Sequence, residues 1–217
     1  MVNSCVAIES IAKAKVFRQR SSMMKLNDTS SILNFLKSRK SASAKAMGGL
    51  GPSASQISEI LEIAVRVPDH GKLSPWRFVL IEGAGAARVG KGFAEIWAKN
   101  NPSHGVESLN FQRGLFMRAP LVLVVVSTAA IHTKIPVWEQ QMSAAAVCYN
   151  TVLGANALGF DAQWQSDWVA YDQSAKAVMG VQPQEQIAGI VYIGTSTVPL
   201  EDRPRPDPAQ LLTRISN

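Results

Sequence analysis

The residues best suited to chemistry lie in separated segments of this sequence rather than in one motif. Residues 38–43 (SRKSAS) place Arg39 and Lys40 beside hydroxyl groups, just past the expected end of a helix. Residues 66–70 (RVPDH) lie between a predicted helix and a predicted strand, in the kind of loop that often carries function. Residues 136–140 (PVWEQ) open a long predicted helix, and residues 164–166 (WQS) follow it. Such cations and hydroxyls, with a mildly basic chain, suit a small anionic ligand.

Two glycine-rich stretches after the first predicted strand are close to nucleotide-binding loops. Residues 83–88 begin like GxGxxG, but Arg88 replaces the third glycine, which allows close packing between helix and strand. Residues 85–92 match GxxxxGK, but Gly92 stands where Ser or Thr must ligate magnesium. The favoured interpretation is a turn and the start of a helix. A P-loop nucleotide hydrolase remains the less favoured alternative function.

The sequence offers little support for a metal site or for a catalytic nucleophile. His70, His104 and His132 show no HxxxH spacing and have no neighbouring cysteine, so no metal site is predicted. No GxSxG elbow of a serine hydrolase occurs. Cys5 and Cys148 lie far apart and form no CxxC, which excludes a disulfide framework and a zinc ribbon. This cysteine usage favours the reducing cytoplasm.

The charge of the chain argues against nucleic acid as a partner. The formal net charge is +6, and about half of the excess lies in residues 1–22, which hold four basic residues against Glu9. The remainder shows no cluster of Lys and Arg with aromatic or amide readers between them. No apolar run approaches the ~20 residues of a membrane span, so no membrane partner is expected. The basic leader has two interpretations, an organellar transit peptide or an extension upstream of a start at Met23 or Met24.

The periodicity predicts the elements that must position these segments. Residues 1–26 are expected to be a leader or a disordered extension, and residues 27–217 a single domain with an extended, proline-rich arm from about 198. Ser53 and Gln56 have the spacing of a capping box. The near-continuous aliphatic run 121–127 is typical of a central strand covered on both faces. Strands are expected over residues 76–82, 121–127, 160–165 and 187–194. Helices are expected from about residue 28, from 53 until before Pro68, around 89–97, around 106–116, over 138–158 and over 172–179.

Taken in this order, the separated segments resemble the nitroreductase family of flavin enzymes, in its compact branch. The resemblance covers about residues 32–208. It implies an α+β fold with a central, mainly antiparallel sheet flanked by helices. It also implies an intertwined homodimer that holds two FMN at its interface. The residues themselves indicate only a sheet covered by helices, and they do not give strand directions.

The resemblance also implies which residues bind the cofactor. Cations would hold the FMN phosphate, and polar groups the ribityl chain and the pyrimidine edge of the ring. The family's flavin-binding positions correspond to Arg39, Lys40, Ser41, Arg66, His70, Trp164, Gln165 and Ser166. A further segment that contacts the nicotinamide nucleotide in this branch corresponds to Gly154, Ala155, Asn156, Ala157, Leu158 and Gly159. Small residues there are also what a closely packed helix requires, so both interpretations stay open.

Two positions depart from the family pattern. Gln165 stands where the branch usually has Arg, so a phosphate or pyrimidine contact would be weaker unless Arg203 or Arg205 of the arm compensates. Ser74 stands where an amide side chain is common. Both departures bear on how FMN is held, rather than on whether the chain belongs to the family.

The function expected from the resemblance is FMN-dependent NAD(P)H oxidoreduction. Hydride would pass from NADH or NADPH to the flavin and then to a small-molecule acceptor such as a nitroaromatic or a quinone. No side chain would act as a catalytic nucleophile, because the flavin carries the chemistry. The alternative within the family is a flavin-binding protein with another role, in dehalogenation or flavin breakdown.

Overall fold

The computed structural model describes residues 25–216, which belong to two compact units. The larger unit spans Ser41–Pro199, and the smaller one combines the chain up to Lys40 with the chain from Leu200 onward. All but the last two residues of the expected leader lie outside the described residues. The prediction of a single domain from residue 27 stays a prediction.

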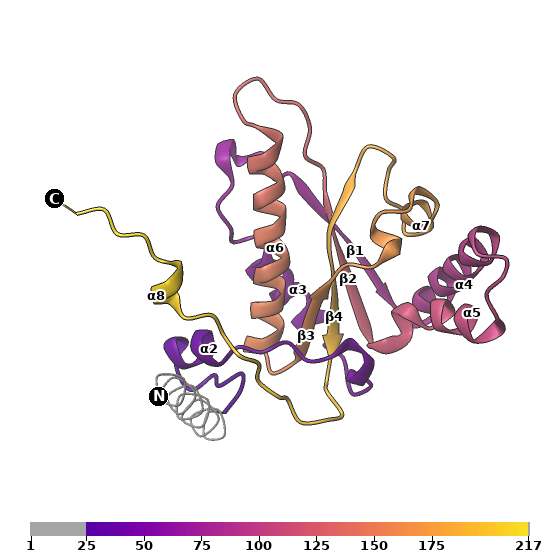
Figure 1. Ribbon diagram of the computed structural model, residues 1–217, viewed down its shortest axis with the longest axis horizontal. Coiled ribbons are helices and arrows are strands. Elements are labelled where there is room, and N and C mark those ends of the chain that lie inside the picture. Colours follow the sequence, from indigo (N-terminus) through magenta and orange to yellow (C-terminus); the bar gives the residue numbers. More distant parts are fainter. Residues whose placement is uncertain (1–24, 217) are drawn as a thin grey trace, which may run out of the picture. The chain divides into compact units, whose positions relative to one another are not determined.

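A four-stranded antiparallel sheet forms the centre of the larger unit (Figure 1). Its strands are β1 (Trp76–Glu82), β2 (Leu121–Ser127), β3 (Asp161–Gln165) and β4 (Gln186–Gly194), in the order β1-β2-β4-β3. All seven residues of β2 are buried, as its unbroken aliphatic sequence predicts. Each neighbouring pair of strands runs antiparallel, which confirms the expected sheet type.

One face of the sheet is covered by α3 (Ala54–Ala64) and α6 (Val137–Ala157), which pack against each other. The capping box predicted for Ser53 and Gln56 is present at the start of α3. The end of α6 is followed by Gly159 at φ 87°, in the left-handed region that glycine adopts without strain. The core on this face consists of Ile60, Ala64, Leu121, Val125, Val147, Cys148, Val152, Ala155, Ala162, Val191 and Ile193.

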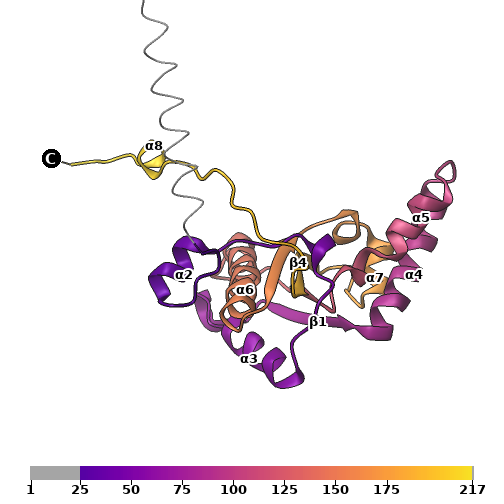
Figure 2. The same ribbon diagram turned by 90° about the horizontal axis from the view of Figure 1, so that it is seen from below.

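The opposite face is covered by α4 (Gly83–Asn100), α5 (Val106–Arg113) and α7 (Gln173–Val178), together with two short 3-10 turns, Leu115–Arg118 and Trp168–Ala170. Figure 2 shows α4 and α5 side by side. Edge-to-face contacts between aromatic rings join this layer to the sheet. Phe93 meets Phe116 at a centroid distance of 5.0 Å, and Phe116 meets Tyr192 of β4 at 5.9 Å.

Both nucleotide-loop lookalikes lie inside α4. Gly83 opens the helix at φ 51°, the residues after it up to Gly92 are helical, and Gly90 approaches the backbone of Arg113 at the crossing of α4 and α5. A phosphate-binding loop needs a non-helical backbone whose N–H groups converge on the ligand. The P-loop interpretation is therefore wrong, and the interpretation as the start of a helix is confirmed.

The smaller unit contains α2 (Ile32–Ser38) and α8 (Pro208–Leu211). Ser31 caps α2 by accepting a hydrogen bond from the Asn34 backbone. The arm is extended except for α8, which the proline content did not predict. Asp207 caps this short helix and Pro208 opens it, a position where proline costs nothing because its missing N–H would have no helical partner.

Candidate functional site

The segment from Arg66 to Ser74 forms a tightly organised loop between α3 and β1. The Asp69 carboxylate accepts hydrogen bonds from the backbone N–H groups of Leu73 at 3.2 Å and Ser74 at 2.8 Å. Gly71 has φ 77°, and a Cβ there would meet the Ile135 side chain, so only glycine fits. Lys72 and Ser74 also have positive φ, at 55° and 47°. Non-glycine residues held in this region cost free energy and concentrate at functional sites.

Helix α6 holds this loop through one row of polar side chains. Glu139 Oε2 lies 2.7 Å from His70 Nδ1. The Ser143 hydroxyl donates to the Pro68 carbonyl at 2.6 Å. The Asn150 amide donates to the carbonyls of Ile63 at 3.2 Å and Arg66 at 2.9 Å. Positions 139, 143 and 150 share one helical face, so α6 fixes both ends of the Arg66–His70 segment.

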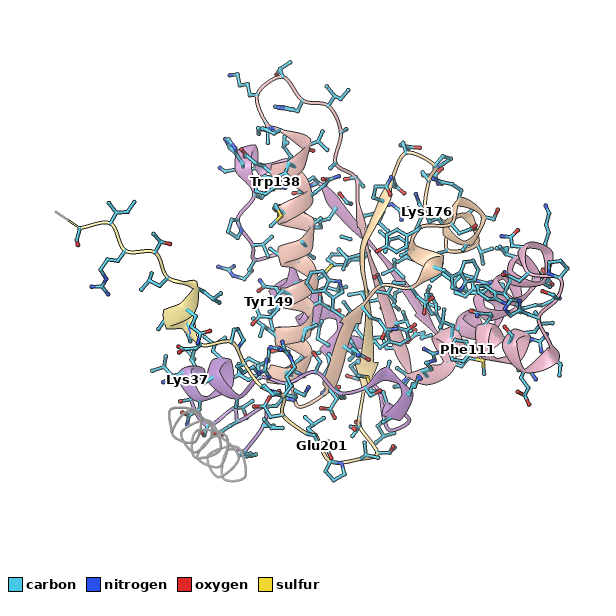
Figure 3. All side chains as sticks on the ribbon, viewed as in Figure 1. Lys37, Phe111, Trp138, Tyr149, Lys176 and Glu201 are labelled. Carbon is cyan, nitrogen blue, oxygen red and sulfur yellow. The ribbon has the colours of Figure 1, made fainter. Side chains whose placement is uncertain are left out.

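A cavity of about 370 Å³ lies beside this loop. Its walls are mostly apolar, and the His70–Glu139 pair supplies the polar side. Trp138 and Met142 line it from α6 and remain largely exposed. Figure 3 shows Trp138 near the first turn of α6 and Tyr149 further along the same helix. The full lining is Pro68, His70, Trp138, Glu139, Met142, Ser143 and Ala146. An apolar pocket with a few convergent polar groups is the usual form of a small-molecule site.

Arg66 and His70 are both exposed at this loop. Among the residues that the structure describes, the Arg66 guanidinium has no hydrogen-bond or ion-pair partner. Arg66 lies two residues before Pro68 of the cavity lining, and an accessible cation in such a loop is suited to an anionic ligand. The structure thus brings two of the predicted site residues together.

The end of β3 carries three further predicted residues. The Trp164 indole lies across β4, where a Cβ on Gly189 would be 2.0 Å from Trp164 Nε1. Trp164 and Ser166 are exposed and Gln165 is half-buried. Gly189 therefore leaves room for the indole on the face of the sheet that α6 covers.

The remaining cationic residues fall at the boundary of the smaller unit. Arg39 and Lys40 end that unit's first segment, and Ser41 begins the larger unit. Within the smaller unit, Arg205 donates to the Arg39 carbonyl at 3.4 Å and pairs with Asp202 at 2.7 Å. The arm thus brings a third cation beside Arg39 and Lys40.

The glycine-rich end of α6 divides into a buried and an exposed part. Gly154, Ala155 and Asn156 are buried, and Gly154 faces the Ile63 side chain of α3. Ala157 and Gly159 are exposed, with Leu158 half-buried between them. The buried part serves the contact between α3 and α6, whereas a nucleotide role for the segment stays a prediction.

Cys148 is not a reactive group of this site. Its thiol is buried in the core between α6 and the sheet, and burial raises its pKa to about 12. A thiol is a nucleophile only as the thiolate. Within residues 25–216, no group of three or more His, Cys, Asp or Glu side chains could hold a metal ion. No helix among the described residues is long and apolar enough to cross a membrane.

Sequence reasoning missed the α6 residues that support the loop. Glu139 was noted only as part of the helix start, and Ser143 and Asn150 stood in an Ala-rich helix without a motif. The available signal was their spacing of four and seven residues, which places the three side chains on one side of the helix. Only the fold shows that this polar face meets the Arg66–His70 loop.

Comparison with known proteins agrees with this arrangement. The model of the nitroreductase family matches residues 42–195. The Escherichia coli protein named "Putative NAD(P)H nitroreductase YdjA" is 31% identical over 184 residues, which cover 83% of this chain and 97% of that protein. Among solved structures, a nitroreductase-like family protein from Bacillus cereus has a TM-score of 0.72 at 22% identity and covers 87% of this chain and 97% of its own. A nitroreductase with bound FMN from Bacteroides fragilis has a TM-score of 0.64 at 19% identity. The match covers 86% of this chain and 99% of that one.

The family match spans both the Arg66–His70 loop and the end of β3, and the solved structures share the antiparallel α+β architecture. The order of segments in the sequence, the fold and the family match all agree, and the chain belongs to the nitroreductase family.

Proposed function

We propose that this protein is an FMN-dependent NAD(P)H oxidoreductase that reduces small aromatic acceptors such as nitroaromatics or quinones. The observation that carries the proposal is the Arg66–His70 loop, which α6 holds against an apolar cavity in a chain of the nitroreductase family. The named relative and the FMN-bound neighbour support the choice of cofactors.

The chemistry of the available side chains fits FMN. The cofactor has a dianionic phosphate, a polyhydroxyl chain and a flat, largely apolar ring. Cations suited to the phosphate are Arg39, Lys40 and Arg205, which lie close together within the smaller unit. The cavity lined by Trp138 and Met142 offers apolar surface to a planar ring. Both classes of group that FMN requires are present in the described residues.

In this proposal, each segment has a separate task. Arg39 and Lys40 bind the phosphate, with Arg39 able to form a two-pronged contact and Lys40 acting as a point charge. Ser41, Arg66 and His70 supply polar contacts, and Trp164, Gln165 and Ser166 run along the flavin. Arg205, beside Arg39, is a further cation for the phosphate.

When bound, FMN would supply the hydride-transfer chemistry between the nicotinamide and the acceptor. The protein's contribution is to bind the ring, exclude water from the cavity and position the two substrates in turn. No nucleophilic side chain is required, in keeping with the buried thiol of Cys148. The exposed residues of the 154–159 segment are proposed to contact NADH or NADPH.

A cofactor experiment tests the proposal directly. The purified protein, incubated with FMN and desalted, should be yellow, and acid should release a flavin that chromatographs as FMN rather than FAD. NADH or NADPH should bleach the flavin, and a nitroaromatic or quinone should restore its colour. A protein that stays colourless would overturn the proposal, and a yellow protein that neither nicotinamide bleaches would favour another flavin-binding role.

The phosphate contact has a matched control. Arg39→Ala should weaken FMN binding by roughly ten- to a hundredfold, the loss of one charge-assisted hydrogen bond. Lys91→Ala should leave binding unchanged, because Lys91 is an exposed residue of α4, far along the chain from the predicted flavin-binding segments, whose ammonium lies 3.9 Å from Glu95. Equal effects of the two substitutions would contradict the assignment of Arg39.

A further inference from the structure

The His70 imidazole is held by a carboxylate that comes from a different element. His70 lies in the loop before β1, whereas Glu139 lies in the first turn of α6, 69 residues later in the chain. Their contact of 2.7 Å between Nδ1 and Oε2 is well within hydrogen-bond distance. The pair lies at the wall of the 370 Å³ cavity, so it faces the place where a ligand would bind.

The contact determines which ring nitrogen is offered to a ligand. An ionised carboxylate can only accept hydrogen bonds, so Nδ1 must carry the proton. In the neutral ring, Nε2 is then an acceptor. The hydrogen bond made by one nitrogen of a histidine fixes the state of the other in this way.

The pair is a poor candidate for a purely stabilising interaction. The side chains are 65% and 41% exposed, and exposed ion pairs contribute ~0–1 kcal/mol to stability. Glu139 also interacts favourably with the N-terminal end of the α6 dipole, but that effect does not require His70. The neighbouring contacts Ser143–Pro68 and Asn150–Arg66 already fix the backbone of the loop. What Glu139 adds is the orientation and tautomer of one ring.

We propose that Glu139 is the positioning residue for His70: it holds the imidazole with Nδ1 protonated and presents Nε2 as an acceptor to a hydroxyl or N–H donor on the ligand. This step rests on the proposed function for the identity of the ligand. In FMN, such donors belong to the ribityl chain and the ring, whereas the ionised phosphate only accepts. His70 therefore recognises the phosphate-free part of the cofactor, and Arg39 recognises the phosphate.

The tautomer can be measured without any cofactor. A long-range ¹H–¹⁵N spectrum of the histidine rings distinguishes Nδ1–H from Nε2–H. It is recorded at increasing pH until the signals no longer change. The chain has three histidines, and His70→Gln identifies the signal. We expect the Nδ1–H form in the parent protein, its loss in Glu139→Ala, and its retention in Glu139→Gln, whose amide oxygen still accepts. Glu62→Ala, an exposed glutamate of α3, serves as the control and should change nothing.

Ligand binding tests the second half of the proposal. Riboflavin shares the ring and the ribityl chain of FMN but lacks the phosphate. Glu139→Ala should lower the affinity for both ligands by the same factor, roughly two- to tenfold for one hydrogen bond. In a His70→Ala background, the same substitution should have no further effect. Arg39→Ala should lower the affinity for FMN and leave the affinity for riboflavin unchanged.

Three results would overturn the proposal. These are an Nε2–H signal for His70 in the parent protein, an Nδ1–H signal that survives in Glu139→Ala, and an effect of Glu139→Ala on FMN but not on riboflavin. Failure of the parent protein to bind either flavin would refute the proposed function instead. The ring spectrum would still decide whether Glu139 positions His70.

Discussion

Gly189 illustrates how a single residue can set the position of a functional side chain. Its lack of a side chain allows the Trp164 indole to lie against β4, where a Cβ would be 2.0 Å from Nε1 and 2.8 Å from Cys148 Sγ. Gly189 also lies beside the irregularity between Val125 and Val126 in the pairing of β2 with β4. The strand is therefore adapted, at one residue, to the ring that is proposed to contact the flavin.

Gly189→Ala should destabilise the protein and displace Trp164. The added methyl group cannot fit without movement, and overpacking of this kind costs ~1–3 kcal/mol. Chemical denaturation should show the loss of stability, and the tryptophan fluorescence spectrum should shift. Gly85→Ala is the matched control, since a Cβ there meets nothing within 4 Å and alanine favours the helix. A Gly189→Ala protein with unchanged stability and fluorescence would show that the indole is not confined.

At the scale of elements, α6 has two distinct tasks. Its apolar face, with Val147, Cys148 and Val152, packs on the sheet, and its polar row holds the Arg66–His70 loop. The loop has backbone strain at Lys72 and Ser74, and the hydrogen bonds from α6 and Asp69 keep it in that form. The helix therefore connects the core to the proposed site.

Asn150→Ala should release the Arg66 end of this loop. The substitution removes donors to the carbonyls of Ile63 and Arg66, and a lost hydrogen bond to the backbone costs ~0.5–1.5 kcal/mol. We expect faster amide hydrogen exchange over residues 66–70 and weaker FMN binding. Gln141→Ala, an exposed amide on the same helix, is the control and should leave both unchanged. Unaltered exchange in the loop after Asn150→Ala would contradict this role of α6.

A second link between elements joins β1 to the turn before β4. Arg77 donates two hydrogen bonds to Glu185, at 2.8 and 2.6 Å, and one to the Gly180 carbonyl at 2.8 Å. The ammonium of the buried Lys176 donates to the Glu185 carbonyl at 2.5 Å. Figure 3 shows Lys176 on α7, surrounded by side chains. Glu185 thus accepts from Arg77 through its carboxylate and from Lys176 through its backbone carbonyl.

The hydrogen bonds from Arg77 hold the pKa of Glu185 below its ordinary value of 4.5. A carboxyl group whose pKa is lowered by folding stabilises the folded state above its unfolded pKa, and this contribution is lost as the pH falls through the folded pKa. Glu185→Gln should therefore cost about 1–3 kcal/mol at pH 7 and progressively less below about pH 4.5. Denaturation of both proteins at pH 7 and pH 3 measures the difference. A cost that does not depend on pH would show that the charge of Glu185 is unimportant.

At the scale of the whole molecule, the exposed apolar side chains suggest a larger assembly. Leu211, Leu212 and Ile215 of the arm are 73%, 63% and 95% exposed, and Trp138 of α6 is 67% exposed. Three large apolar groups exposed within five residues of the arm are uncommon on a monomer. We propose that a second copy of the chain covers them in a homodimer, with the arm from about residue 198 contributing to the interface.

Truncation after Thr197 should yield a monomer that loses FMN as well. An obligate homodimer interface would bury upward of ~2,000 Å², and the truncation removes the exposed apolar side chains of the arm that are proposed to lie in it. Sedimentation velocity at micromolar concentration and a flavin spectrum measure the two properties. The full-length Leu211→Asp, Leu212→Asp double variant, which keeps the arm and its cations, should also dissociate but retain more affinity for FMN. A truncated protein that remains dimeric would exclude the arm from the interface.

The sequence by itself determined the elements and their order. The strands 76–82 and 121–127 have the bounds that their aliphatic runs predict, and the capping box at Ser53 and the glycine after α6 lie at the expected helix ends. These signals are local, because caps, periodicity and β-branched runs act over a few residues. The family was also within reach of the sequence, since its segments keep their order along the chain.

Only the tertiary structure decided how distant segments meet. The antiparallel order β1-β2-β4-β3 cannot be read from strands separated by helices, because connections of that length allow either direction. In the same way, the role of Gly90 follows only from the fold, because a Cβ there would meet the backbone of Arg113 where α4 packs against α5. Glu139 could not be assigned to His70 from sequence, since 69 residues separate them and only the packing of α6 beside the loop brings the two side chains to 2.7 Å.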